Sequence, residues 1–289
     1  MRLGIVLFIL LIVSASAPAL AFAAEEKAGF EERDSHGVTQ TLHEDAPKSW
    51  GFSVGLSGNS TLHESMDVNG SQYLQISAIP SYQFNESFIG SLYFIQNQKL
   101  KADRDLTICD SGIGLSYAGF HATPYFKVSG AIGSKIPLAK TLRDDDSLIT
   151  TFSVAPKAAL DLSHTRFSRL NASYGLALRR AFHRYETSAS GDSNDQYRVN
   201  QSLVLGLDLS EKVSFTSAFQ YSSRWTYRST LFNRYSFDEA LSYQATRAFS
   251  IALGLGNSGD GLKANGFDSN IAVFDKNSTE VSLGATYVF

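Results

Sequence analysis

Apolar and polar residues alternate along most of the chain between residue 49 and the C-terminus. In the segment 50–57, Trp50, Phe52, Val54 and Leu56 alternate with glycine and serine. A period of two residues is typical of a β-strand whose two faces meet different surroundings. The same alternation recurs at 74–81, 199–209, 249–256 and 281–289. We therefore expect a chain built from strands, each with one apolar and one polar face.

The pattern predicts twelve strands, and the connections between them fall into two alternating classes. The strands are expected at 49–60, 72–84, 87–98, 106–120, 124–135, 148–162, 166–184, 196–209, 213–227, 231–245, 248–257 and 278–289. Tight connections at 85–86, 121–123, 163–165, 210–212 and 246–247 alternate with longer ones at 61–71, 99–105, 136–147, 185–195 and 258–277; the connection at 228–230 is a short exception. This alternation predicts an all-β fold, a single closed antiparallel up-and-down transmembrane β-barrel with both termini on the periplasmic side. A secreted β-sandwich has no reason to sort its connections in this way.

The first 48 residues differ from the rest. Residues 1–23 read as a secretory signal peptide, with Arg2 before an apolar run at 3–13 and small residues at Ala21 and Ala23. The run is shorter than the ~20 residues that span a bilayer as a helix. Residues 24–48 hold seven acids and three bases without strand or helix periodicity. We expect a flexible, acidic periplasmic segment there, followed by the barrel at 49–289.

Composition narrows the function classes. Hydrophobic residues make up 43% of the chain and charged residues 18%, below the ~25% usual for soluble domains. The single cysteine, Cys109, excludes an internal disulfide framework and a cysteine-based zinc site. A net charge of −3 gives no reason to expect a nucleic-acid partner. We predict no cofactor and no bound metal, because the oxygen donors of the 258–277 loop lack the spacing of a calcium loop.

Aromatic residues gather at the ends of the predicted strands and at the C-terminus. Phe84 and Phe88 flank the first tight turn, and similar rings flank the others, as in the aromatic girdle of a membrane barrel. The last strand, EVSLGATYVF, alternates its apolar residues and ends in Phe289. In this respect the chain resembles Gram-negative outer-membrane β-barrel proteins. The resemblance implies an outer-membrane location in contact with outer-membrane lipid, and an assembly signal at Tyr287 and Phe289 that the barrel-assembly machinery recognises.

The polar parity of the strands predicts the lining of the lumen. Nine bases fall on it: Lys127, Lys135, Lys157, Arg169, Arg179, Arg198, Arg224, Arg228 and Arg234. Five acids accompany them: Asp110, Asp161, Asp208, Asp238 and Glu280. A surplus of inward cations favours anions in a water-filled pore, and the guanidinium fork suits carboxylate and phosphate. The alternative is a packed polar interior in which the bases pair with the acids, since twelve strands lie between filled and open barrels.

Three features do not fit a regular barrel. Pro156 lies in the middle of a predicted strand and removes a ladder hydrogen bond, for which a bulge is the expected accommodation. Glu239 falls on the outward parity, which requires either a bulge or an outward section that begins after it. The 87–98 strand is apolar on both parities, so its inner face is not assigned.

Three functional hypotheses follow. The first is a small passive diffusion channel for small solutes, with a preference for anions. The second is a non-conducting structural or surface-interaction barrel. The third is a lipid-modifying enzyme, suggested by the spacing of His63 and Ser65, but the pair lies in a predicted loop without further motif residues. We therefore expect no catalytic residue.

Overall fold

The computed structural model describes residues 50–62, 72–100, 106–162, 165–263, 268–275 and 278–289. The predicted signal peptide, the acidic segment 24–48, and His63 and Ser65 lie outside these residues. In the described part of the chain, no helix has the length and apolar character needed to cross a membrane.

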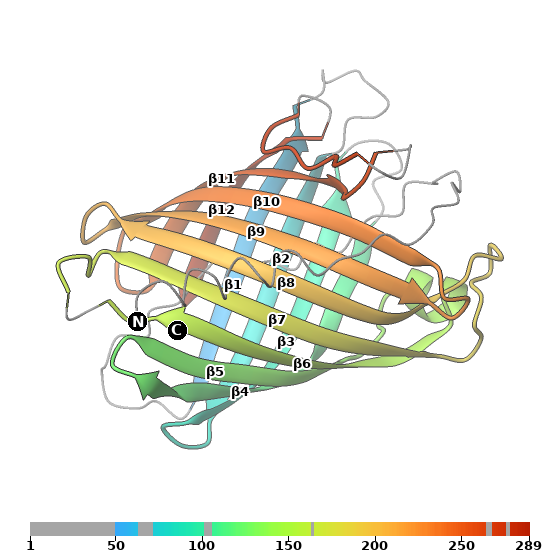
Figure 1. Ribbon diagram of the computed structural model, residues 1–289, viewed down its shortest axis with the longest axis horizontal. Coiled ribbons are helices and arrows are strands. Elements are labelled where there is room, and N and C mark those ends of the chain that lie inside the picture. The colour runs from blue at the N-terminus through green and yellow to red at the C-terminus, as the bar shows by residue number, and fades with distance from the viewer. Residues whose placement is uncertain (1–49, 63–71, 101–105, 163–164, 264–267, 276–277) are drawn as a thin grey trace.

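Twelve strands form along the described residues (Figure 1). They are β1 (Trp50–Thr61), β2 (Gln72–Gln83), β3 (Phe88–Lys99), β4 (Leu106–Thr123), β5 (Phe126–Lys135), β6 (Leu148–Leu160), β7 (Leu170–His183), β8 (Asp195–Asp208), β9 (Val213–Thr226), β10 (Leu231–Gln244), β11 (Phe249–Asp260) and β12 (Glu280–Val288). A single π-helical turn, η1 (Thr141–Asp145), interrupts the β5–β6 connection. The predicted number and order of strands are confirmed.

The strands close into one antiparallel barrel. Each strand pairs with its neighbours in sequence, and β1 pairs with β12 from Ser53 opposite Val288 to Thr61 opposite Glu280. Closure leaves no edge strand, so no row of backbone groups is open to pairing with another chain. The tight connections lie at one end, here called the short-turn end, and the others lie at the opposite, long-loop end. This architecture confirms the predicted fold class.

The two faces of each strand divide as the alternation predicts. Residues paired across antiparallel strands point to the same face. Leu253 on β11 pairs with Leu283 on β12, and both are more than half exposed, at 52% and 59%. Their neighbours Gly254 and Ser282 form the adjacent pair on the other face. Large apolar side chains are exposed in this way along the barrel strands. Soluble monomers rarely expose such a contiguous apolar surface.

The register of β3 settles the face that the sequence left open. Leu92 and Phe94 are exposed on the outside, at 39% and 44%. Tyr93 pairs with Gly112, and Asn97, which is buried, follows on the same inward parity. The strand is apolar on both parities because its inner face carries Ile89, Tyr93 and Ile95.

Bulges make β4 longer than predicted. The ladder with β5 shifts between Tyr117 and Phe120 and again between His121 and Thr123. Gly119 lies at this first shift with a φ of +99°, and a Cβ atom there would collide with the carbonyl oxygen of Val128. Such a conformation suits glycine and is typical of a β-bulge. The strand therefore continues to Thr123 instead of ending at residue 120.

The expected bulge at Pro156 is absent, which corrects the sequence-based expectation. β6 pairs with β5 in unbroken register through Pro156, opposite Gly130. On the β7 side the register is the same before and after the proline, and only the partners of Ala155 and Pro156 are missing. The proline therefore removes local pairing with β7 without displacing the strand, because its missing N–H points to that side.

No bulge occurs in β10 near Glu239. β10 pairs without a register shift with both β9 and β11, and Glu239 stands opposite Ser217 and Leu255. Leu255 is 46% exposed on the outer surface. The carboxylate therefore keeps its outward position, and the bulge proposed for this strand is wrong.

The β6–β7 connection is longer than the sequence suggested. The strand predicted from residue 166 begins at Leu170, because residues 165–169 form a turn. Ser168 donates its N–H to the carbonyl of Thr165, and Leu170 donates to Phe167. These local hydrogen bonds hold the segment in a turn where alternation alone predicts a strand.

Replacing Leu283 with arginine tests the orientation of the outer surface. In phospholipid vesicles we expect Leu283→Arg to lower the free energy of unfolding by about 2–4 kcal/mol, because the cation would face hydrocarbon. Urea titration measures the effect. The matched variant Ser57→Arg places the same charge on the inner face beside Gly284 and should cost far less. Equal losses in the two variants would contradict the assigned faces.

Candidate functional site in the barrel lumen

Three of the predicted arginines form one row on the inner wall. Arg179 on β7 pairs with Arg198 on β8, and Arg198 pairs with Arg224 on β9. The next residue, Arg180, and the preceding residue, Leu178, are exposed on the outer face. The arginine row therefore lies on the lumen side of three consecutive strands.

Asp195 holds two members of this row. Its carboxylate Oδ2 accepts hydrogen bonds from Arg198 Nη2 at 3.0 Å and from Arg224 Nη1 at 3.3 Å. The three side chains retain only 20–28% exposure. Charge-assisted contacts of this kind are the stronger class of hydrogen bond, and the aspartate offsets part of the repulsion between the guanidinium groups.

Sequence reasoning missed Asp195 for a physical reason. Strict alternation puts residues 195 and 198 on opposite faces, and the sequence placed Asp195 in a loop. In the structure the β8–β9 ladder shifts between Asp195 and Tyr197, so one extra residue restores Asp195 to the inner face. The sequence does contain one indication of this contact, since Asp195 stands three positions before Arg198, which is predicted to point inward.

Small residues continue the arginine row around the barrel. From Arg179 the cross-strand partners run through Ser153 on β6, Gly133 on β5, Gly114 on β4, Ser91 on β3 and Ser81 on β2. Strands in a barrel tilt by about 35–45°, so a row that follows the pairing climbs along the barrel axis. The small residues on β2 lie near the short-turn end, and Arg224 lies two residues from the long-loop end of β9.

Four other predicted bases lie in strands on the inner parity. Lys127 and Lys135 belong to β5, Lys157 to β6 and Arg234 to β10. Lys135 is buried between its partners Gly112 and Thr151, with 4% exposure. Lys157 pairs with Ser129 and Gly175 on the inner parity, and its side chain is exposed to solvent. Arg234 lies 3.9 Å from Asp260, its cross-strand partner.

The remaining two predicted bases lie outside the strands. Arg169 is exposed in the turn before β7, where its carbonyl accepts the N–H of Asp208. Arg228 is exposed after the end of β9, and its N–H donates to Ser193 Oγ at 3.3 Å. The two residues lie at opposite ends of the barrel because local turns end the strands before the alternation stops.

Three of the acids predicted to face the lumen have cross-strand partners on the inner face. Asp208 pairs with Ser214, and Asp238 and Glu280 both pair with Gly256. Tyr73 lies within 3.5 Å of Glu280 and donates its hydroxyl to that carboxylate. Asp161 follows β6, and its carboxylate lies 3.7 Å from His121 Nδ1. Acids and bases therefore share the inner wall.

Two connections meet above the arginine row at the long-loop end. Asn194 Nδ2 donates to the carbonyl oxygens of Asp146 and Tyr185, at 2.8 and 3.0 Å. The Ala189 N–H donates to the carbonyl of Asp145 at 2.7 Å. Burial, together with the nearby charges of Asp145 and Asp195, raises the pKa of the Asp146 carboxyl. The loop acids therefore stand beside the arginine row.

The C-terminal aromatics lie on the outer surface at the short-turn end. Tyr287 and Phe289 are 44% and 62% exposed. Their ring centroids are 4.6 Å apart, and the ring of Phe289 also lies 5.7 Å from that of Phe52 on β1. The Phe289 N–H donates to the Phe52 carbonyl, so the last residue still belongs to the closing seam.

Comparison with solved structures defines the class of fold. The barrel matches the NanC porin with a TM-score of 0.52 and 12% identity, over 82% of this chain and 98% of NanC. It matches an outer membrane channel from Pseudomonas putida F1 with a TM-score of 0.55 and 12% identity, over 88% of this chain and 100% of that channel. The chain thus has the twelve-strand fold of Gram-negative outer-membrane porins. No protein-family model and no curated sequence matches it.

Removing the Asp195 carboxylate tests its role in holding the arginine row. We expect Asp195→Asn to lower the free energy of unfolding by about 1.5–3 kcal/mol, because two partly buried guanidinium groups lose a charged acceptor. Chemical unfolding in detergent micelles measures the loss. The control is Asp144→Asn, which removes the exposed contact with Arg143 at 2.9 Å and should leave the unfolding free energy close to its original value. A similar effect of both variants would refute the assignment.

Asp146 should make stability depend on pH. Its folded-state pKa lies above the ordinary value of 3.8, so the folded state keeps this proton at pH values where the unfolded chain has lost it. The contribution of Asp146 to the free energy of unfolding is fully present below pH 3.8, and it is lost as the pH rises through the raised folded-state pKa. We expect Asp146→Asn to remove this dependence in a pH series of urea titrations. A constant difference between variant and parent across the series would contradict the prediction.

Proposed function

We propose that the protein is a small passive diffusion channel of the outer membrane that prefers anions. The observation that carries the proposal is the row of Arg179, Arg198 and Arg224 on the inner wall, with Asp195 as its bound acid. The likeness to NanC and to the Pseudomonas channel supports a channel-type barrel.

The arrangement favours anions for an electrostatic reason. The row itself consists of three guanidinium groups and the Asp195 carboxylate, so bases outnumber acids among its own residues. A cationic ring in a narrow, low-dielectric pore lowers the barrier for anions and raises it for cations. The planar guanidinium also presents paired donors to a carboxylate or phosphate. Small anionic solutes are therefore the expected cargo.

A non-conducting barrel is the second candidate, and one observation favours it. Several inward polar side chains are buried in the wall: Lys135, Thr151, Asn97 and Asn200 have exposures of 4–8%. Packing of this kind fills part of the interior, as it does in narrow barrels. Against it, Lys157 is exposed on the inward parity of β6.

The proposed location follows from the outer surface. Exposed aromatics at the short-turn end include Trp50, Phe84, Phe120 and Tyr243, consistent with a girdle at the periplasmic interface. We propose export through a cleaved signal peptide at 1–23, a periplasmic acidic segment at 24–48, and assembly through recognition of Tyr287 and Phe289 by the barrel-assembly machinery.

Single-channel recording tests the channel. In a planar bilayer with a salt gradient, we expect a current whose reversal potential reports anion preference. Substituting Arg179, Arg198 and Arg224 together with glutamine should reduce the anion-to-cation permeability ratio several-fold, because the row loses its charge.

The control for this measurement is a charge outside the lumen. Lys212, exposed in the β8–β9 turn, serves in Lys212→Gln, which should keep the parent selectivity. Absence of current from correctly folded protein would favour the non-conducting barrel. Cation preference of the parent protein would refute the role of the arginine row.

A further inference from the structure

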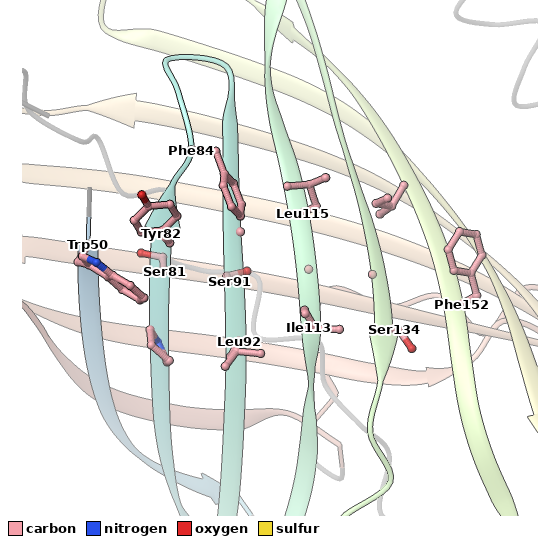
Figure 2. A pocket seen from close by; sticks show the side chains of 15 residues that line it. Trp50, Ser81, Tyr82, Phe84, Ser91, Leu92, Ile113, Leu115, Ser134 and Phe152 are labelled. Carbon is pink, nitrogen blue, oxygen red and sulfur yellow. The ribbon is translucent and has the colours of Figure 1, made fainter. Parts of the chain in front are cut away.

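The outer wall of the barrel contains an apolar groove that the channel hypothesis does not use. It has a volume of about 480 Å³ and crosses the outer surface from β1 to β6 (Figure 2). Trp50, Tyr82 and Phe84 line one end and Phe152 lines the other, and these rings are labelled in the close view. Trp50, Phe84 and Phe152 are 70%, 61% and 49% exposed, so the groove opens outward.

The pairing register explains why the groove is there. One outward row runs from Trp50 through Tyr82, Gly90, Leu115 and Ile132. The next outward row runs from Leu92 through Ile113, Ser134 and Phe152. Neighbouring outward rows are two residues apart along each strand, about 7 Å. Ser134 is the smallest side chain of its row, and the ring of Phe84 lies over Gly90.

An arginine stands at the Phe152 end of this groove. Arg180 on β7 is the cross-strand partner of Phe152 and lies in the same outward row. Its guanidinium carbon lies 5.0 Å from the ring centre of Phe182 and 5.4 Å from that of Tyr197. Among the described residues, no acidic side chain forms a salt bridge with Arg180.

The position of Arg180 along β7 sets its depth. It is ten residues from Leu170, where the strand begins at the short-turn end. At about 3.3 Å per residue and a tilt near 40°, ten residues rise roughly 25 Å along the barrel axis. An outer-membrane barrel presents an apolar band about 25 Å tall. Arg180 therefore lies at the upper border of that band, where the headgroups of the outer leaflet begin.

We propose that this surface binds an anionic, phosphorylated lipid of the outer leaflet. The lipid phosphate contacts Arg180, and one acyl chain lies in the groove along Phe152, Ser134 and Ile113, which belong to the same outward row. The inference rests on the proposed membrane location and is independent of conduction.

Two interactions together select such a lipid. The two rings beside Arg180 hold its cation at the surface without neutralising it, and a phosphate then supplies the missing counter-charge through short charge-assisted hydrogen bonds. The groove adds van der Waals contact along the chain that a flat outer wall does not offer. A zwitterionic lipid makes the same van der Waals contact in the groove, but its headgroup interacts more weakly with Arg180. The surface therefore favours lipids with a net negative headgroup.

Tryptophan fluorescence tests the proposal when the reporter lies in the part of the groove near Arg180. Ile113 lines the groove in the row of Arg180, and the chain has only two tryptophans, Trp50 and Trp225. The full chain carrying Trp50→Phe, Trp225→Phe and Ile113→Trp is reconstituted in phosphatidylcholine vesicles. A small fraction of the lipid is replaced by phosphatidic acid or by phosphatidylcholine with the same brominated chains, which quench tryptophan on contact. We expect several-fold stronger quenching by the brominated phosphatidic acid.

Three variants isolate the two parts of the site. Arg180→Gln should make the two brominated lipids quench equally, and Ser134→Phe should reduce the preference by filling the groove. The matched control is Arg166→Gln, because Arg166 also stacks on an aromatic ring, that of Phe167 at 4.8 Å, but lies at the short-turn end. This variant should keep the parent preference.

Equal quenching of the parent protein by both lipids, or a preference that survives Arg180→Gln, would overturn the proposal. Vesicles made entirely of brominated phosphatidylcholine quench the Ile113→Trp reporter only when the barrel is inserted. That measurement tests the membrane location separately, so a failure of insertion is distinguishable from a failure of lipid selection.

Discussion

A backbone that crosses hydrocarbon must find all its hydrogen-bond partners within the protein. In this chain the requirement is met by the seam between β1 and β12, which are the two strands that an open sheet would leave as edges. The seam continues to the last residue, since Phe289 donates to Phe52. Every other property of the wall depends on this closure, because only a closed ladder gives each residue a fixed inner or outer position.

Closure lets adjacent residues serve two different solvents. Arg179 and Arg180 are neighbours in sequence and point to opposite sides of one strand. The first joins a row of cations held by Asp195 in the lumen, and the second stands between aromatic rings on the outer wall. Of the small residues that continue the arginine row inside, all but Ser153 also line the outer groove. The lining of the lumen and the outer surface thus depend on one thin wall.

Most of the fold could be predicted from alternation because burial in a barrel follows a period of two. Strand number, order and faces emerged from it, and so did the inward parity of Arg179, Arg198 and Arg224. Alternation did not predict the positions where a turn or a bulge changes the local geometry. A turn places Arg169 outside β7, β6 passes Pro156 without a bulge, and a bulge brings Asp195 to the arginines. Neither composition nor alternation encodes such one-residue events.

The bulges have a consequence for how such a chain tolerates insertions and deletions. Each strand has a reading frame of two residues, and one residue gained inside a strand exchanges every position beyond it between water and lipid. The extra residue between Asp195 and Tyr197 is a frame shift that the ladder already absorbs close to a loop. Length changes should therefore accumulate in the long connections and at such bulges, and be rare within the regular stretches of β9, β10 and β11.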